Sequence, residues 1–103
     1  MNNVSLFGRL DSEPQLQGIP GRDVCEFWLA VNGRLDKQTL YVKVIAFRAL
    51  AERLAEELRE GDRIALSGHL RSQRWPGSRR LYVHSVLARD VQLAQSPDGG
   101  NSG

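Results

Sequence analysis

The chain has 103 residues, which is enough for one small domain. With 41% hydrophobic and 25% charged residues it is too apolar for a disordered chain, and its longest apolar stretch, residues 27–31, is far shorter than the roughly 20 residues of a transmembrane helix. The N-terminus lacks the pattern of a secretory signal, and the single cysteine, Cys25, excludes an internal disulfide framework. We therefore expect a cytoplasmic protein in a reducing compartment.

Charge is unevenly distributed along the chain, although the formal net charge is only +2. Residues 63–89 contain six arginines and no Asp or Glu, whereas four glutamates fall within residues 52–60. Arginine also outnumbers lysine by twelve to two, and its planar guanidinium suits phosphate contacts and stacking on bases. This distribution indicates a polyanionic partner, but a solvated surface with clustered charges explains it equally well.

The first half of the chain reads as three strands. Alternation of apolar and polar residues predicts strands over 3–10, 23–34 and 39–47. Residues 11–22 contain two prolines and two glycines, which predicts a loop with a short extended segment. In the third strand, one face carries Leu40, Val42, Val44 and Ala46, and the opposite face carries Tyr41, Lys43, Ile45 and Phe47.

The second half adds one helix and two strands. Apolar residues recurring every three or four positions predict a helix over 48–60, with Gly61 as its left-handed cap. Alternation predicts strands over 63–74, where Leu70 shares the apolar face, and over 79–93, with an interruption near 88–90 and a turn at 75–78 between them. Residues 95–103 read as a disordered tail after a domain of residues 1–94.

This order of elements is typical of an OB-fold, an all-β class in which a five-stranded Greek-key barrel has one helix between its third and fourth strands. OB-folds bind oligonucleotides or oligosaccharides. An open α+β sandwich is the alternative that the periodicity leaves open.

No pattern in the sequence predicts catalysis, a cofactor or a metal. Cys25 lies in an apolar strand, where a lone cysteine is usually a small buried hydrophobe. His69 and His84 lie on predicted strands without Cys or acidic residues at metal-binding spacing. Asp11 and Glu13 are close together but lie in a loop. We interpret the chain as a non-enzyme without cofactors.

Binding to single-stranded nucleic acid is better supported. Tyr41 and Phe47 flank Lys43 on one strand face, which core packing explains poorly, and Trp75 lies at a predicted turn. Near Trp75 in the sequence are Arg71, Arg74, Arg79 and Arg80. Cations follow the phosphates and ring faces accept unpaired bases in such sites. For these aromatic residues, core packing or an oligomer contact remains the alternative, as it does for Trp28, which is predicted to point away from the core.

Four motifs together resemble the bacterial single-stranded DNA-binding protein family. They are Val4-Ser5-Leu6-Phe7-Gly8-Arg9-Leu10 with the following Asp11-Ser12-Glu13-Pro14, then Phe27-Trp28-Leu29-Ala30, then residues 44–52, and finally residues 61–75 with Gly68-His69-Leu70-Arg71 and Trp75. The resemblance covers roughly residues 2–94, and several motifs in register are more specific than any one of them.

The resemblance implies an OB-fold that assembles as a homotetramer, or as a homodimer, and coats single-stranded DNA at the nucleoid during replication, recombination or repair. Trp75 and Phe47 match base-stacking aromatic residues of the family, and Tyr41 stands where a tryptophan is usual. The basic residues at its DNA path correspond to Lys43, Arg48, Arg71 and Arg74, and our candidate site also includes Arg79 and Arg34.

Three features differ from the family pattern. Leu35 stands where another stacking tryptophan is common, the connection between the second and third strands is short, and the acidic tail that recruits replication and repair proteins has no counterpart after Gln95. Whether a longer chain carries that tail stays open. A primosomal-type OB-fold adaptor that docks replication partners is the alternative function, and a preference for RNA is not excluded by base stacking.

Overall fold

The computed structural model describes residues 2–18, 20–32, 38–74, 77 and 82–95. Along this part of the chain the elements are β1 (Val4–Leu10), β2 (Gln15–Gln17), β3 (Val24–Asn32), β4 (Thr39–Phe47), α1 (Arg48–Glu57), β5 (Arg63–Arg74) and β6 (Tyr82–Gln95). The predicted order of strands and helix is confirmed, and the short extended segment predicted within residues 11–22 is β2.

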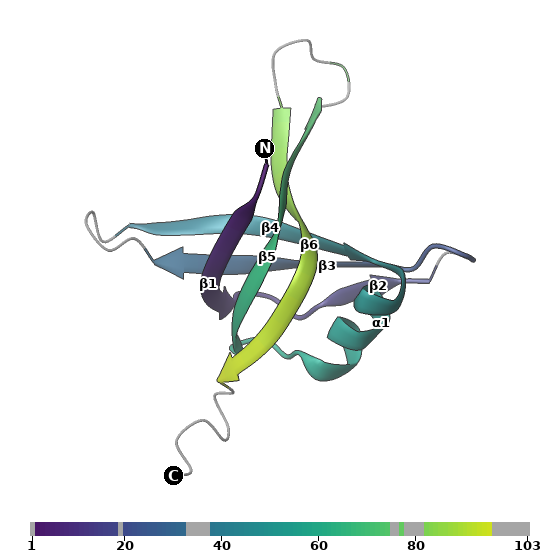
Figure 1. Cartoon of the computed structure of the whole chain (residues 1–103), viewed down its shortest axis with the longest axis horizontal. Coiled ribbons are helices and arrows are strands. Elements are labelled where there is room, and N and C mark those ends of the chain that lie inside the picture. Colours follow the sequence, from purple (N-terminus) through teal and green to yellow (C-terminus); the bar gives the residue numbers. More distant parts are fainter. Residues whose placement is uncertain (1, 19, 33–37, 75–76, 78–81, 96–103) are drawn as a thin grey trace.

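Five of these strands close into a barrel (Figure 1). Hydrogen bonding runs in the order β1-β5-β6-β4-β3-β2, and the pairing of β1 with β3 joins the two sides of the sheet. β4 and β6 are parallel, and the other neighbours are antiparallel. β2 adds to the outer edge of β3, so it is not one of the barrel strands. A closed five-stranded barrel with one helix is an OB-fold, as predicted, and the open sandwich is wrong.

The core follows the predicted alternation. Its buried side chains come from every barrel strand and from α1, and they include Leu10, Cys25, Phe27, Leu29, Val44, Leu54, Ile64 and Val86. Two residues of the predicted apolar faces are exceptions, because Leu40 is 59% and Leu70 is 50% exposed. Leu70 lies past the end of β1, which pairs with β5 only as far as Gly68, and Leu40 lies outside residues 43–45, over which β4 pairs with β6. At each position the strand has lost one of its two neighbours, and β5 and β6 continue from here as a two-stranded arm (Figure 1).

Two glycines permit the close backbone approaches that closure requires. A Cβ on Gly8 would collide with the carbonyl oxygen of Ala30 on β3, and one on Gly68 would collide with that of Leu87 on β6. At Gly68 the register also shifts, because Ser67 pairs with Asp90 while Gly68 pairs with Ala88. Arg89, which lies between Ala88 and Asp90 on β6, is therefore bulged, and the irregularity predicted near residues 88–90 is confirmed.

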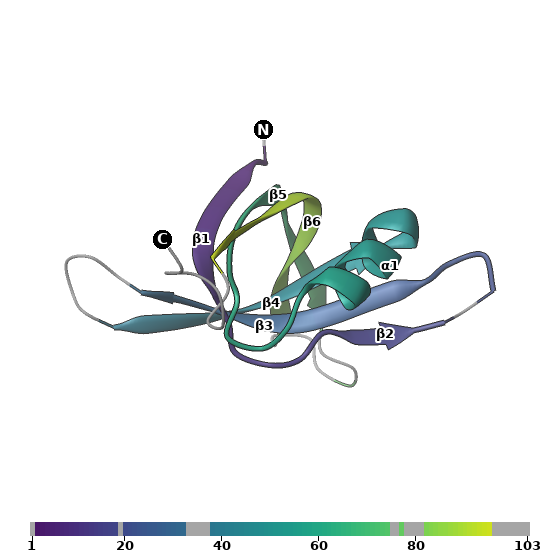
Figure 2. The ribbon, with the colours of Figure 1, turned by 90° about the horizontal axis from the view of Figure 1, so that it is seen from below.

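The end of the helix differs from the prediction. α1 ends at Glu57 rather than residue 60, and Leu58 is extended, with its N–H donating to the carbonyl oxygen of Leu54 at 3.0 Å. Gly61 has a φ of 96°, but it serves the turn into β5 and is not the helix cap. This turn is fixed by Asp62, whose side chain accepts the N–H of Arg59 at 2.9 Å. The helix thus lies against β3 and β4 at one end of the barrel (Figure 2).

Most other differences concern element ends. The first strand begins at Val4 rather than residue 3, and the described part of the second predicted strand spans Val24–Asn32. β6 extends to Gln95, so it includes the first residue of the predicted tail. Within the described ranges, no helix has the length and apolar character to cross a membrane.

Candidate nucleic-acid interface

The outer face of β4 carries the predicted aromatic and basic residues. Val44 and Ala46 are buried in the barrel, so Tyr41, Lys43 and Phe47 alternate to the opposite side of the strand. The Tyr41 side chain is 57% exposed, whereas Lys43 and Phe47 are partly buried. These three residues therefore share one outward face.

The junction between β4 and α1 has an unusual backbone conformation. No loop separates the two elements, and Arg48, the first helical residue, has a φ of 58°. The left-handed region costs a non-glycine residue roughly 1–2 kcal/mol and persists only where neighbouring groups hold it. Here the N–H of Arg48 donates to the carbonyl oxygen of Asp23 at 2.8 Å, and Val24 pairs with Phe47. The loop before β3 is thereby held beside the start of the helix.

This junction creates a basic hollow of about 370 Å³ lined by Arg22, Phe47, Arg48 and Arg71. We call it the arginine hollow. Its residues come from the loop before β3, the end of β4, the start of α1 and β5. Among the residues that the structure describes, none of the three arginines forms an ion pair, whereas Arg9 and Arg53 each contact a carboxylate. Three guanidinium groups without carboxylate partners favour an anionic ligand.

Phe47 also borders a second hollow. This hollow of about 300 Å³, which we call the apolar hollow, is lined by Phe47, Leu50, His69, Leu87, Ala88 and Arg89. Phe47 thus contributes both to a basic surface and to a largely apolar one. Such an arrangement can contact a charged phosphate and a flat base at the same time.

Lys43 and Tyr41 lie outside these two hollows. Lys43 Nζ is 3.3 Å from Glu26 Oε1, so its charge already has a partner. Tyr41 is six residues from Phe47 on an extended strand, which corresponds to about 20 Å. The structure therefore brings Phe47, Arg48 and Arg71 together, and it leaves Lys43 and Tyr41 farther along the same strand face.

The side chains of the remaining predicted residues fall outside the described part of the chain. Trp75, Arg79 and Arg34 are not among the described residues, and of Arg74 only the backbone, at the end of β5, is described. Arg22, by contrast, was not predicted. Its proximity to Phe47 depends on the register of β3 against β4 and on the hydrogen bond of Arg48 with Asp23, and neither has a signal in the sequence.

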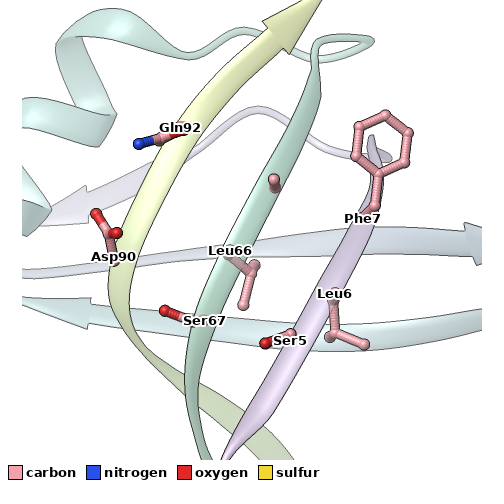
Figure 3. Close-up of a pocket in the computed structure, with 8 residues that line it drawn as sticks. Ser5, Leu6, Phe7, Leu66, Ser67, Asp90 and Gln92 are labelled. Carbon is pink, nitrogen blue, oxygen red and sulfur yellow. The ribbon is translucent and has the colours of Figure 1, made fainter.

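A different surface lies over β1, β5 and β6 (Figure 3). Its hollow of about 450 Å³ is lined by Ser5, Leu6, Phe7, Ala65, Leu66, Ser67, Asp90 and Gln92, and we call it the Phe7 hollow. Phe7 is 54% exposed. Within the described residues, β1 pairs with β3 only at Arg9 and Leu10, so the other edge of Val4–Gly8 has no strand partner.

The described titratable side chains do not form a metal or nucleophile site. No group of three or more His, Cys, Asp or Glu within the described ranges is arranged to hold a metal ion. Cys25 is fully buried, and this burial, followed by the negative charge of Glu26, raises the pKa of its thiol. The thiol is therefore held protonated, which makes it a poor nucleophile.

Comparison with known proteins agrees with the motifs and the barrel. A model of the single-strand binding protein family matches residues 1–94. The chain is 32% identical to single-stranded DNA-binding protein 3 of Listeria innocua, over 100% of this chain and 69% of the relative. It is 33% identical to the single-stranded DNA-binding protein of Bacillus cereus, over 97% of this chain and 64% of the relative. It is 31% identical to single-stranded DNA-binding protein A of Bacillus subtilis, over 100% of this chain and 64% of the relative.

The chain thus belongs to the single-strand binding protein family, and the resemblance seen in its motifs is confirmed. It spans 69% of the Listeria innocua relative and only 64% of each Bacillus relative, which is about two thirds of their lengths.

Proposed function

We propose that this protein binds single-stranded DNA without strong sequence preference. The observation that carries the proposal is the arginine hollow, in which Phe47 is bordered by Arg22, Arg48 and Arg71. Membership of the single-strand binding protein family and the names of the relatives support the same conclusion.

The mechanism follows from the two hollows that Phe47 lines. An unpaired base stacks on the Phe47 ring and occupies the apolar hollow. Stacking of this kind contributes about 1–3 kcal/mol of binding free energy per base. The neighbouring phosphates contact the guanidinium groups and release their counterions. Ring faces, and guanidinium groups that contact phosphates, do not distinguish one base from another, so little sequence preference is expected. Trp75, Tyr41, Lys43, Arg74, Arg79 and Arg34 extend this path in the proposal.

We also propose that the protein associates with itself, as a homotetramer or a homodimer, through the Phe7 surface. An unpaired strand edge beside an exposed aromatic side chain is a typical site of association, because pairing satisfies the edge and covers the ring. The lining of the Phe7 hollow contains Asp90 and no basic residue, which disfavours DNA there. Docking of a replication protein at this surface is the adaptor alternative.

In the cell the protein would coat and protect single strands exposed during replication, recombination or repair, without catalysis. We expect it in the cytoplasm at the nucleoid, because its substrate is exposed there. Any recruitment of replication or repair proteins would have to use the domain itself or a segment beyond these residues.

The test is a titration of the protein with fluorescein-labelled oligo-dT, followed by anisotropy at two salt concentrations. We expect saturable binding whose log affinity falls with log salt by about 0.7 for each phosphate contacted. A duplex of the same length should compete poorly, and a matched RNA strand measures the preference for sugar. Absence of oligo-dT binding at low salt would exclude the proposed function and favour the adaptor.

A further inference from the structure

Trp28 is an exposed aromatic residue that the arginine hollow does not include. It lies on β3, where the neighbouring Phe27 and Leu29 are buried in the core, and it is itself 45% exposed. The register opposes Trp28 to Lys43 and Ala30 to Tyr41. Paired residues of a sheet share a face, so Trp28 and Tyr41 lie diagonally across β3 and β4 on the outer surface, at about 7–8 Å.

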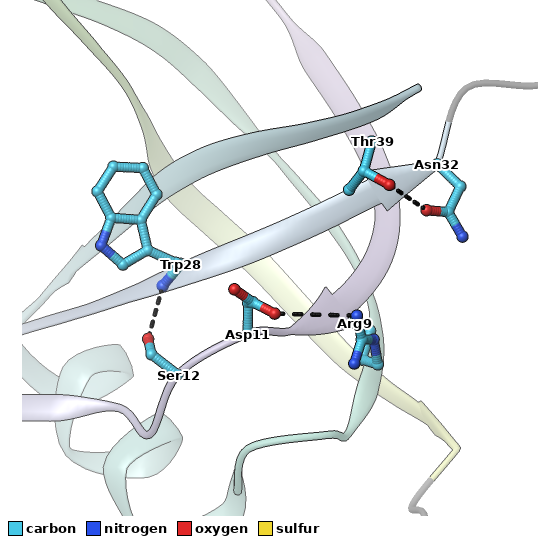
Figure 4. A network of polar contacts seen from close by, with 6 residues as sticks. All are labelled: Arg9, Asp11, Ser12, Trp28, Asn32 and Thr39. Atoms are coloured by element: carbon cyan, nitrogen blue, oxygen red, sulfur yellow. Dashed lines mark hydrogen bonds and ion pairs between the residues drawn. The ribbon is translucent and has the colours of Figure 1, made fainter. Parts of the chain in front are cut away.

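The backbone under Trp28 is fixed on the strand edge away from β4. Its N–H donates to Ser12 Oγ at 3.0 Å (Figure 4), and its carbonyl oxygen accepts the N–H of Asp11 at 2.8 Å. The ring is therefore presented by a rigid strand, so that a ligand stacking on it loses little backbone entropy from the protein.

Two basic side chains near Trp28 are already paired. Lys43 contacts Glu26 at 3.3 Å, and Arg9 contacts Asp11 at 3.8 Å. This surface therefore differs from the arginine hollow, because these two described cations have carboxylate partners. A ligand here would gain stacking and very little from phosphate contacts.

We propose that Trp28 is a further base-stacking residue for single-stranded DNA, beside Tyr41 of the proposed path. The inference rests on the proposed function and adds a contact to it. A strand whose base stacks on Phe47 and which continues along the outer face of β4 passes Lys43 and reaches Tyr41 and Trp28.

A base suits this surface better than a protein partner does. A protein interface over Trp28 would have to remove the Lys43–Glu26 and Arg9–Asp11 pairs from water, and desolvation of ion pairs is costly. A base that covers only the ring leaves both pairs hydrated. The surface is also continuous with the β4 face that carries Phe47, on which the proposed function depends.

The experiment uses the two tryptophans of the chain, Trp28 and Trp75. In the full chain carrying Trp75→Phe, all tryptophan emission comes from Trp28, and we expect it to be quenched as oligo-dT is added. Trp28→Ala should weaken oligo-dT binding by about 5- to 150-fold, the equivalent of one stacked base, and Trp28→Phe should retain most of the affinity. The slope of log affinity against log salt should be unchanged in both, because no phosphate contact is lost.

Three outcomes separate the possibilities. If wild-type protein fails to bind labelled oligo-dT, the proposed function fails and this inference fails with it. If wild-type protein binds but Trp28→Ala binds equally well and Trp28 emission does not change, only this inference is overturned. If Trp28→Ala changes the sedimentation of the DNA-free protein while Leu16→Ala, at another exposed apolar residue, does not, Trp28 is a subunit contact and the inference is again overturned.

Discussion

The surfaces around Phe47 and Phe7 look alike at first and differ in charge. Each has an aromatic side chain on the outer face of a strand, beside a hollow of about 370 Å³ for Phe47 and 450 Å³ for Phe7. The arginine hollow beside Phe47 is lined by three arginines, whereas none of the described residues that line the Phe7 hollow is basic. Arg9 and Arg63 line a separate hollow with Phe7 at the end of β1. Arg9 there is paired with Asp11.

Exposure of an aromatic ring therefore does not identify its ligand. The charges around the ring and the hydrogen bonding of its strand indicate the ligand. A base carries a phosphate that needs cations, whereas a protein strand carries backbone donors and acceptors that need an unpaired strand edge. β4 has neighbours on both sides, whereas β1 has an edge without a partner among the described residues. We assign DNA to the first surface and self-association to the second on these grounds.

Alanine substitution of each phenylalanine is the strongest test of that assignment. Phe47→Ala should weaken oligo-dT binding by about 5- to 150-fold, because one stacking surface is lost. Phe7→Ala is the matched control: it should leave the affinity of each binding site unchanged and weaken self-association by about tenfold or more. Anisotropy measures the first effect and sedimentation velocity the second.

The reverse pattern, in which Phe7→Ala abolishes DNA binding and Phe47→Ala dissociates the oligomer, would show that the two surfaces are exchanged. Thermal unfolding of both variants guards against misfolding, since Phe47 is partly buried and its truncation also removes packing.

The arginines give a smaller but more specific effect. Arg71→Ala and Arg48→Gly should each lower the slope of log affinity against log salt by about 0.7, because each removes one phosphate contact. Arg63→Ala is the control, because Arg63 is an exposed arginine on the same strand as Arg71. It lines the separate hollow with Phe7 and Arg9 and not the arginine hollow. Its slope should equal that of the wild type.

Arg48→Gly also separates binding from stability. Glycine adopts a positive φ without the steric penalty of arginine, so the free energy of unfolding should stay the same or rise by up to about 1 kcal/mol. A loss of affinity together with unchanged or greater stability in urea would indicate that Arg48 is kept for its ligand. If stability falls with affinity, the strained residue has a structural role instead.

Much of the fold could be predicted from the sequence, because its signals are local. A two-residue period marked the strands, a change of period marked α1, and the irregular stretch near residues 88–90 marked the bulge opposite Gly68. The failures arose where tertiary structure decides. Leu40 and Leu70 have the pattern of core residues, but they lie where β4 and β5 have lost one of their two neighbouring strands.

The candidate site was less accessible to sequence reasoning for the same reason. Phe47, Arg48 and Arg71 carry a family resemblance, but their convergence with Arg22 depends on pairing between distant strands. The ion pair of Lys43 with Glu26 likewise follows from neighbouring strands and cannot be read from spacing. The sequence alone therefore predicted the types of residue at the site better than it predicted which residues lie next to one another in the folded protein.

The smallest predicted effect concerns the scaffold behind Phe47. Cys25 pairs with Ala46 on the inner side of β3 and β4, and burial raises the pKa of its thiol above the ordinary value of 9.0. The folded state then binds the thiol proton more tightly than the unfolded state, so this contribution to stability is complete below pH 9 and is lost as the pH rises above it. Urea unfolding at pH 8 and pH 10 should show a decrease in wild-type protein that exceeds the decrease in Cys25→Ala, by at most about 1.4 kcal/mol per pH unit. Equal decreases in the two proteins would mean that the thiol ionises freely in the folded state, and that the strand pair under Phe47 is open to water at Cys25.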